Sequence, residues 1–461
     1  MTEFMSQSDA FTWAMESDAR LRSTVVTVIM LDRAPDWDVV RSRFEVVART
    51  LPIFRQVVIE SPPPTPPRWE FAPDFDPDFH LRRVSAPEPR DLTGVLEMAR
   101  VAAMADFDRA RPLWTATLIE GLDDGGAAVL MKFHHALTDG VGGVQIAMTI
   151  FDLTEQPREM ETVSAGGGEP EVHRHGPLTE LADDVVDAIR YDLGLLRQAV
   201  TGAVTKGPKL VLDGIRRPLQ TASSAAELAG SVYRFVRPVS ETGSPLMKER
   251  SLSRQLGVHE VPLSAMKAAA HRGGGALNDA FVAGIAGGLR RYHEKHGVTV
   301  GDLHLTMPIS IRKEGDEMGG NHITLARFDV PVGMSDPAER IAETRVRTTK
   351  VRNERSTPYV QILAGAMNLM PRWYIGSMLR KVDFLASDVP GVPVPVYLGG
   401  AKVRTQYAFG PTIGAAVNVT LLTYCDSCVL GIDVDTGAIP DYEEFHDCLV
   451  AGFDEVLALA D

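Results

Sequence analysis

The chain has 461 residues, of which 44% are hydrophobic and 23% charged, and its formal net charge is −14. The composition is that of a soluble globular protein, and the length exceeds what one hydrophobic core usually supports. The acidic balance argues against nucleic-acid binding, three cysteines are too few for a disulfide framework, and no apolar run is long enough to span a bilayer. The N-terminus does not resemble a secretory signal. We therefore expect two domains in a cytoplasmic protein.

The first third of the chain alternates between strand and helix patterns. Residues 24–31 (TVVTVIML) predict a buried strand, and residues 36–51 carry apolar side chains on one helical face. Residues 114–122 and 127–135 predict two strands joined by the turn DDGG, and a helix follows them. We interpret residues 1–160 as a mixed α+β domain.

The middle of the chain predicts a connection between two halves. Residues 154–176 are rich in Glu, Pro, Gly and Ser, which is typical of a flexible linker. Residues 177–237 favour helices that cross between the halves. Their basic stretch, 190–217, fits either an anionic lipid surface or a helix packed between domains. We assign residues 161–245 to the linker and crossover helices, and 246–461 to the second domain.

The second domain repeats the mixed pattern. Its expected helices are residues 277–297, 336–355 and 441–460, and its expected strands are 303–312, 324–332, 415–424 and 428–435, the last two as a hairpin.

A pair of neighbouring histidines ends an apolar strand in KFHHALTDGVGG, residues 132–143. Side chains alternate along a strand, so His134 and His135 are expected to point to opposite faces, which argues against one metal ion held by both. His135, at the strand end, is the candidate general base, because a neutral imidazole is available near pH 7. Asp139 is expected to fix the loop by pairing with an arginine or with backbone amides, and Gly140 lets the backbone turn tightly. Two histidines that merely end a core strand are the alternative, but the complete unit favours an active site.

HHALTDG resembles the His-His-x-x-x-Asp-Gly motif of the CoA-dependent acyltransferase superfamily, which includes chloramphenicol acetyltransferase-like folds and peptide-synthetase condensation domains. Other segments are similar to those of the bacterial wax ester synthase/diacylglycerol acyltransferase family, in the family's order and across nearly the whole chain. These segments are Pro-Leu-Trp (Pro112, Leu113 and Trp114), Asn-Asp (Asn278 and Asp279), MPISIR, GGN (Gly319 to Asn321), SDVPG and YLGGAKV.

The resemblance implies an α+β fold of two chloramphenicol-acetyltransferase-like domains, joined by a helical crossover, with the active-site channel between them. It implies an acyl-CoA-dependent O-acyltransferase that transfers a long-chain acyl group to diacylglycerol, giving triacylglycerol, or to a fatty alcohol, giving a wax ester. His135 would be the general base, with His134 in a supporting role. Asp139 would be structural, with Arg312 as its partner. Asn278 would give polar support near the base or the oxyanion, and an N-cap role for Asn278 stays open beside it.

The implied partners are acyl-CoA as co-substrate, diacylglycerol or a long-chain alcohol, and a membrane or lipid-droplet surface at which the protein would be peripheral. No cofactor, metal ion or nucleic acid is expected. CDSC with His446 and Cys448 resembles a zinc site, but free thiols in a turn and a core are the interpretation that we favour.

One residue departs from the family's pattern. Asp388 stands where Asn is usual, and an ionised carboxylate accepts hydrogen bonds without donating them, so we expect an effect on substrate preference.

Two alternative functions stay open. One is an acyltransferase for a polyketide or glycolipid hydroxyl, and the other is a catalytically silent lipid-binding protein.

Overall fold

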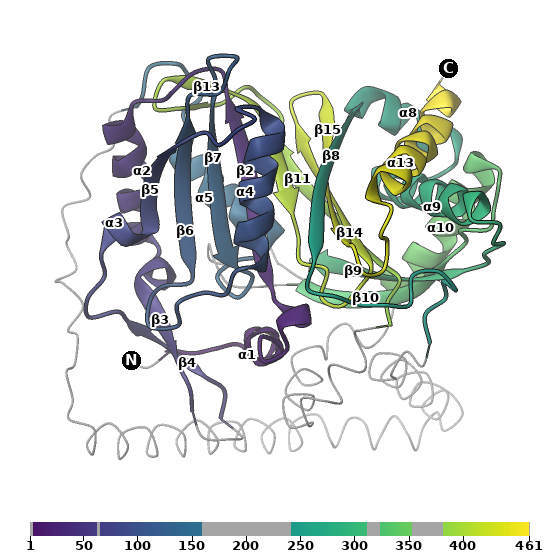
Figure 1. Ribbon diagram of the computed structural model, residues 1–461, viewed down its shortest axis with the longest axis horizontal. Coiled ribbons are helices and arrows are strands. Elements are labelled where there is room, and N and C mark those ends of the chain that lie inside the picture. Colours follow the sequence, from purple (N-terminus) through teal and green to yellow (C-terminus); the bar gives the residue numbers. More distant parts are fainter. Residues whose placement is uncertain (1–2, 62–64, 159–240, 311–322, 353–380, 461) are drawn as a thin grey trace, which may run out of the picture.

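The computed structural model describes residues 3–61, 65–158, 241–310, 323–352 and 381–460. Two six-stranded sheets stand side by side, each with helices packed against it (Figure 1). This arrangement confirms the predicted α+β fold with two sheet-based halves. Most of the predicted linker and crossover region, 161–245, lies outside the described residues, so the domain boundaries stay a prediction.

The N-terminal sheet has the strand order β12-β13-β2-β7-β6-β5. Its strands are β2 (Thr24–Leu31), β5 (Leu81–Ser85), β6 (Trp114–Glu120), β7 (Ala127–His134), β12 (Tyr397–Leu398) and β13 (Ala401–Phe409). The strand predicted over residues 24–31 is confirmed as β2, and six of its eight residues are buried, as suits a β-branched segment in the middle of a sheet. A small separate sheet joins β1 (Glu3–Phe4), β4 (Arg68–Phe71) and β3 (Gln56–Ile59).

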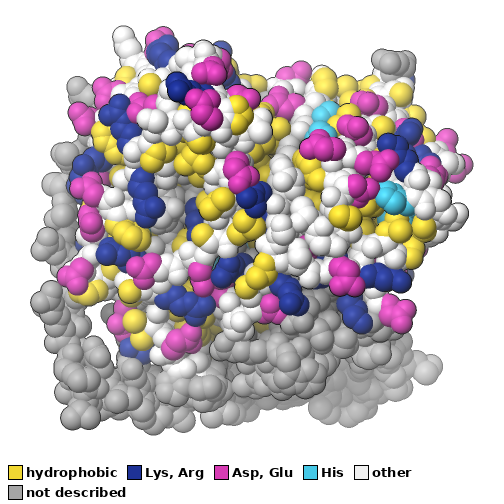
Figure 2. All heavy atoms as spheres, viewed as in Figure 1, with side chains coloured by type: hydrophobic (Ala, Val, Ile, Leu, Met, Phe, Trp, Pro, Cys, Tyr) yellow, Lys and Arg dark blue, Asp and Glu magenta, His cyan; other side chains and the backbone are white. Residues whose placement is uncertain are grey.

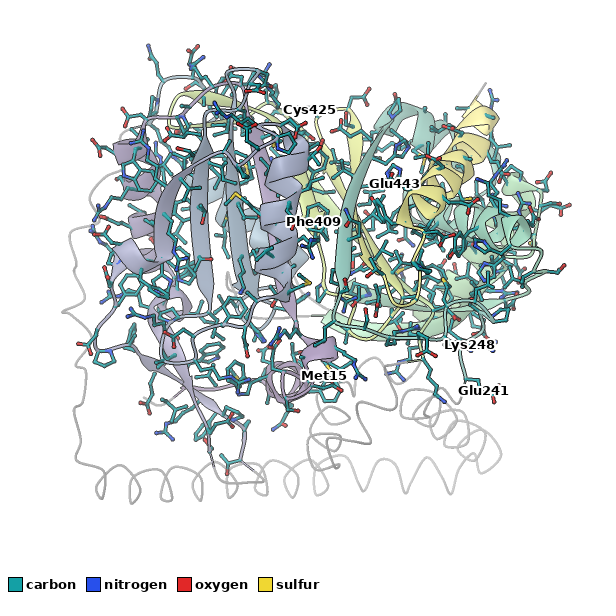
Figure 3. The ribbon with its side chains drawn as sticks, in the orientation of Figure 1. Met15, Glu241, Lys248, Phe409, Cys425 and Glu443 are labelled. Atoms are coloured by element: carbon teal, nitrogen blue, oxygen red, sulfur yellow. The ribbon has the colours of Figure 1, made fainter. Side chains whose placement is uncertain are left out.

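One segment of the C-terminal half belongs to the N-terminal sheet. β13 pairs antiparallel with β2, although the strands before and after it in the chain, β11 (Phe384–Val392) and β14 (Val417–Tyr424), belong to the C-terminal sheet. Phe409, at the end of β13, therefore lies at the junction of the two halves (Figure 3). The local sequence pattern did not predict this exchange, because strand pairing over such a distance is not a local property.

The C-terminal sheet has the strand order β10-β9-β11-β14-β15-β8. Its other strands are β8 (Arg254–Pro262), β9 (Leu303–Ser310), β10 (Ile323–Val330) and β15 (Ser427–Asp435). β14 and β15 form the predicted hairpin, and Cys425 lies in its turn with a φ of 52° (Figure 3). Cys428 and Cys448 are free thiols packed within the hydrophobic core of this half.

Helices cover both sheets. Those of the N-terminal half are α1 (Gln7–Met15), α2 (Trp37–Thr50), α3 (Pro77–His80), α4 (Leu92–Met104) and α5 (Gly140–Ile150), and those of the C-terminal half are α8 (Leu263–Arg272), α9 (Leu277–Lys295), α10 (Pro337–Arg352) and α13 (Tyr442–Leu457). Acidic caps begin several of them: Asp36 accepts hydrogen bonds at the start of α2, Asp91 at α4 and Asp336 at α10. Within the described part of the chain, no helix is both long and apolar enough to cross a bilayer.

The N-terminal sheet carries helices on both faces. α4 lies in front of β2 and β7 in Figure 1, and α5 lies behind the sheet. Because side chains alternate along β7, successive residues of this strand face two different surroundings.

Candidate active site

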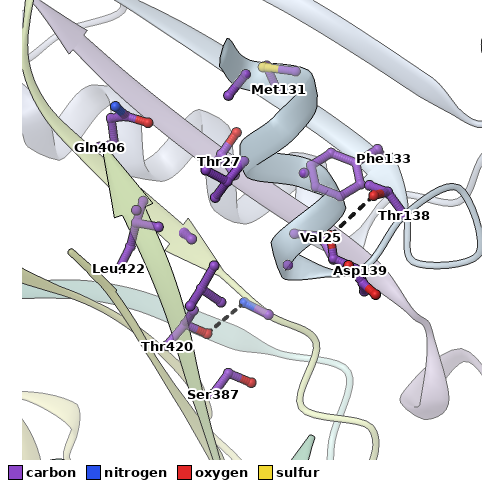
Figure 4. A pocket seen from close by; sticks show the side chains of 18 of the residues that line it. Val25, Thr27, Met131, Phe133, Thr138, Asp139, Ser387, Gln406, Thr420 and Leu422 are labelled. Atoms are coloured by element: carbon purple, nitrogen blue, oxygen red, sulfur yellow. Dashed lines mark hydrogen bonds between the residues drawn. The ribbon is translucent and has the colours of Figure 1, made fainter. Parts of the chain in front are cut away.

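A cavity of about 170 Å³ lies between the two sheets, and we call it the interdomain cavity. Its wall combines β2, β7 and α5 with β13, which is supplied by the C-terminal half, and with β11 and β14 across the gap (Figure 4). Its lining includes Met131, Phe133, His135, Thr138, Asp139, Gly140, Ser387, Asp388, Val389, Gln406, Gly410 and Thr420. The cavity therefore lies in the region between the halves where the sequence predicts the active site.

His135 lies in the wall of this cavity. Its backbone N–H donates to the carbonyl oxygen of Ser23 at 2.9 Å, which fixes the residue at the end of β7. The ring Nδ1 is buried and has no hydrogen-bond partner among the described residues. Burial is the main influence on the His135 pKa and lowers it, so the imidazole is neutral at pH 7.

His134 faces the other way. Its side chain is fully buried, and its ring packs edge-on against Trp13 at 5.6 Å and against Phe107 at 6.0 Å between centroids. Nδ1 accepts a hydrogen bond from the Ala136 N–H at 3.0 Å, so the ring proton is on Nε2, which lies 3.2 Å from Oε1 of Glu16. The expectation of opposite faces is confirmed, and His134 cannot share a ligand with His135.

Asp139 holds the loop after the histidines. It is the N-cap of α5, and its Oδ1 accepts the Gly142 N–H at 2.8 Å, which is one of the two pairings that we expect from the sequence. Its predicted partner Arg312 lies outside the described residues. At Gly140 a Cβ atom would lie 2.8 Å from Cγ2 of Val389, so only glycine lets α5 approach β11 this closely.

The Pro-Leu-Trp segment anchors the histidine strand from the side. The carbonyl oxygen of Leu113 accepts the His134 N–H at 3.0 Å. Trp114 is buried, and its Nε1–H donates to the Phe54 carbonyl at 2.8 Å. Pro112 is also buried. These residues position β7, and their contacts are backbone and packing contacts.

The Asn-Asp pair lies at the start of α9. Ala276 is the N-cap of this helix, so the N-cap alternative for Asn278 is wrong. The capping carboxylate is that of Asp279, which accepts the Ala276 N–H at 2.8 Å and the Thr348 hydroxyl at 2.8 Å. Asn278 is not among the described residues that line the interdomain cavity. Its polar support of the base stays a prediction.

Sequence reasoning missed α1 and the residue that follows it, Glu16. Oε1 of Glu16 accepts the Ser23 N–H at 2.5 Å and faces His134, so one buried carboxylate contacts both segments that hold His135. A local signal for α1 exists, because the hydroxyl of Ser6 accepts the N–H of Asp9 at 3.1 Å in a Ser-x-x-Asp capping pattern. Burial raises the Asp9 pKa to about 7.

The C-terminal half contributes polar groups that the sequence did not indicate. Oγ1 of Thr420 accepts the Gly410 N–H at 3.2 Å, so its O–H remains a donor beside the cavity (Figure 4). Ser387 and Gln406 add a hydroxyl and an amide to the lining. Burial raises the pKa of Asp388 to about 6, with Arg352 opposing it, so at pH 7 most of this carboxyl is ionised. Its effect on substrate preference stays a prediction.

Two family models match the chain in succession. The wax ester synthase/diacylglycerol acyltransferase catalytic domain matches residues 5–281, and the WS/DGAT C-terminal domain matches residues 319–456. Together they span both halves of the fold.

Similar proteins include two from Mycobacterium tuberculosis strain H37Rv, both provisionally named diacylglycerol O-acyltransferases. The first is 38% identical over 453 residues, which is 96% of this chain and 90% of that protein. The second is 27% identical over 446 residues, which is 92% of this chain and 89% of that protein.

Two solved structures share the fold. The wax ester synthase/diacylglycerol acyltransferase of Marinobacter aquaeolei VT8 superposes with a TM-score of 0.65 at 19% identity, covering 99% of each chain. The starter condensation domain of rhizomide synthetase, solved with C8-CoA and Leu-SNAC, superposes with a TM-score of 0.61 at 14% identity, covering 100% of this chain and 94% of that one.

Proposed function

The chain belongs to the wax ester synthase/diacylglycerol acyltransferase family, and from that premise we propose that it is an O-acyltransferase that moves a long-chain acyl group from acyl-CoA to the hydroxyl of diacylglycerol. A long-chain alcohol is the second acceptor. One observation carries the proposal: His135, neutral at pH 7 and with its Nδ1 closed off, lies in the wall of the cavity between the halves.

The proposed reaction is a direct transfer. The acceptor hydroxyl donates to Nε2 of His135, which takes the proton while the oxygen attacks the thioester carbonyl carbon. The tetrahedral intermediate collapses as the carbon–sulfur bond breaks, and the departing CoA thiolate takes the proton from the imidazolium. The products are the ester and CoA-SH, no covalent acyl-enzyme forms, and no cofactor beyond the co-substrate acyl-CoA takes part.

The negative charge on the carbonyl oxygen needs a hydrogen-bond donor as the intermediate forms. We assign this role to the Thr420 hydroxyl, because its oxygen already accepts a backbone N–H and its hydrogen is left to donate. Asp139 and Gly140 keep the histidine loop against β11, and His135 and Thr420 line the same cavity, which supports this assignment.

Both acceptors are lipids, so the enzyme must collect them from a membrane or lipid-droplet surface. We propose peripheral contact with the inner membrane face or with lipid droplets. The support is the chemistry of the substrates and the apolar side chains of the cavity wall, among them Met131, Phe133 and Val389.

The test is release of CoA thiol from palmitoyl-CoA with diacylglycerol, with hexadecanol and with no acceptor. We expect acceptor-dependent release by the wild type, and loss of about 10²- to 10⁴-fold in turnover by His135→Ala. His271→Ala, at an exposed position at the end of α8, is the matched control and should keep full activity. A wild type that is silent with every acceptor would point to the lipid-binding alternative, and a fully active His135→Ala would overturn the base assignment.

A further inference from the structure

A second cavity, of about 500 Å³, lies on the opposite face of β7 from His135, and we call it the α4 cavity. Its floor is the outer face of β6 and β7, where Thr115, Thr117, Leu130 and Lys132 point away from the interdomain cavity. One wall is α4. The volume lies within the range of small-molecule sites, and the acyl transfer proposed above uses none of these residues.

The α4 helix has one broad apolar face. Val95 and Ala99 are fully buried against the core of the N-terminal half, and Met98 and Ala102 pack beside them. Met98, Val101 and Ala102 lie toward the edge of this face that borders the cavity, and Val101 is 52% exposed. In Figure 2 the same face of the molecule is hollowed beside the position of α4, with hydrophobic side chains along the rim. An apolar helix face that borders a cavity is available to an apolar ligand.

Lys132 places a buried cation at the floor of this cavity. Lys132 is only 8% exposed. Its Nζ donates to the carbonyl oxygens of Ala105 at 2.8 Å and Asp106 at 3.1 Å, and lies 4.2 Å from the centroid of the Phe107 ring. All of these partners are uncharged groups. Among the described residues no carboxylate forms an ion pair with Nζ, and Asp106 and Glu16 act on its charge only from farther away, so one of its three donors remains.

None of the carboxylates that line the cavity forms an ion pair with Lys132, and each pairs with an arginine instead. These pairs are Glu88 with Arg90, Glu97 with Arg100, Asp106 with Arg22 and Asp108 with Arg111. Among the described residues, neither Lys132 nor Arg82, which also lines the cavity, forms an ion pair. Two lining cations without carboxylate partners make the inner end of the cavity attractive to an anion.

We propose that the α4 cavity binds a long-chain carboxylate, with the carboxylate group at Lys132 and the alkyl chain along Met98, Val101 and Ala102. An uncharged alkyl ligand would leave the Lys132 ammonium without an ion pair. A small anion would leave the apolar helix face uncovered. Only a molecule with both parts matches both features of the cavity.

The binding test separates the two parts of the ligand. Dodecanoate, methyl dodecanoate and butyrate are titrated into the full-length protein by calorimetry, each below its micelle concentration. We expect dodecanoate to bind at least about tenfold more tightly than either control, because the ester lacks the charge and butyrate lacks the chain. Equal affinity for dodecanoate and its methyl ester would overturn the proposal.

The location test uses a fatty acid with a diazirine in its chain, crosslinked by light and mapped by tryptic digestion. The label should appear in the two α4 peptides, residues 91–100 and 101–109. Label confined to residues 133–158, which contain His135, would assign the binding to the interdomain cavity and overturn the proposal.

Two variants complete the test. Lys132→Met should reduce the affinity for dodecanoate at least about tenfold and leave that for the methyl ester unchanged, while Lys402→Met, an exposed lysine on β13, should change neither. Ala102→Leu fills the cavity from a partly exposed helix position, so it should weaken both long-chain ligands while the protein stays folded. Unchanged dodecanoate binding in both variants would contradict the proposed site.

Discussion

The two faces of β7 carry different chemistry within one strand. On one face Met131 and Phe133 lead to His135 in a cavity of about 170 Å³ that both halves of the molecule enclose. On the other face Leu130 and Lys132 line a cavity of about 500 Å³, which the N-terminal half forms alone. The strand alternation that separates the two histidines therefore also separates the two cavities.

The difference shows how burial acts on two bases in one strand. Burial lowers the pKa of both His135 and Lys132, because it disfavours the charged form of each. For the histidine this keeps the base neutral and ready to accept a proton. For the lysine it leaves a buried cation that forms no ion pair among the described residues. The same physical effect therefore favours proton transfer on one face and anion binding on the other.

The largest expected effect comes from replacing each of the two neighbouring histidines by alanine in turn. His135→Ala should lose about 10²- to 10⁴-fold in turnover with little change in stability. His134→Ala should remove about 3 kcal/mol from the free energy of unfolding, because it empties a fully buried site between Trp13 and Phe107 and removes the acceptor of the Ala136 N–H. Turnover and urea unfolding of both variants measure the contrast.

The contrast between His134 and His135 would be contradicted if the two alanine variants behaved alike. A stable His134→Ala protein with no activity would mean that His134 takes part in the chemistry, contrary to its burial away from the interdomain cavity.

Glu16 tests how strongly the buried face supports the catalytic face. Glu16→Ala leaves the Ser23 N–H without its acceptor and removes the carboxylate that lies 3.2 Å from Nε2 of His134, and should cost about 2 kcal/mol of stability. Turnover should fall about tenfold with the KM for palmitoyl-CoA unchanged, because Ser23 also holds the His135 backbone. Glu16→Gln keeps an acceptor oxygen and should lose less of both. Equal losses in the two variants would show that the charge, and not the hydrogen bonds, is what matters.

Gly140 tests the closure of the interdomain cavity. The added methyl of Gly140→Ala would stand 2.8 Å from Val389, so α5 and β11 must move apart at a cost of about 1 kcal/mol. A few-fold loss of turnover should accompany it. The double variant Gly140→Ala, Val389→Ala removes the clash and should recover most of the loss, as measured by kinetics and thermal unfolding. No recovery would mean that the glycine is needed for its backbone and not for the contact with β11.

How far the sequence predicted this site depends on how local each signal is. The strand over residues 24–31, the opposed histidines and the pairing of Asp139 with a backbone amide, one of the two pairings expected for it, follow from periodicity and side-chain chemistry within a few residues, and the structure has all three. Exchange of β13 into the N-terminal sheet and the Glu16 contact with His134 did not follow, because both depend on segments far apart in sequence.

Local patterns also explain the error at α9. Asn278 has the residue type of an N-cap, yet the N-cap position is held by Ala276 and the helix begins at Leu277. The capping side chain is that of Asp279, whose carboxylate accepts the backbone N–H of Ala276. The α4 cavity was invisible from the sequence for a different reason. Lys132 lies among apolar residues in a strand, and only the packing of α4 shows that, in the described part of the chain, no carboxylate forms an ion pair with it.

The final prediction is that the two faces respond to pH in opposite directions. The His135 pKa lies below its usual value of about 6.5, so the neutral base persists as the pH falls through 6.5, and kcat/KM should decline only at lower pH. Lys132 has a pKa lowered to about 8 by burial, which outweighs Asp106 and Glu16, while Arg22 and Arg82 add to the lowering. Dodecanoate is ionised around and above pH 8, so its affinity should fall as the pH rises through about 8 and the ammonium loses its proton. Turnover and calorimetric affinity, measured between pH 5 and pH 9 on the same protein, test both effects. Lys132→Met is the control. It should lose the decline of dodecanoate affinity at alkaline pH and keep the decline of turnover at acid pH. An affinity for dodecanoate that does not change above pH 8 would mean that Lys132 does not hold the carboxylate, even if the chain binds along α4.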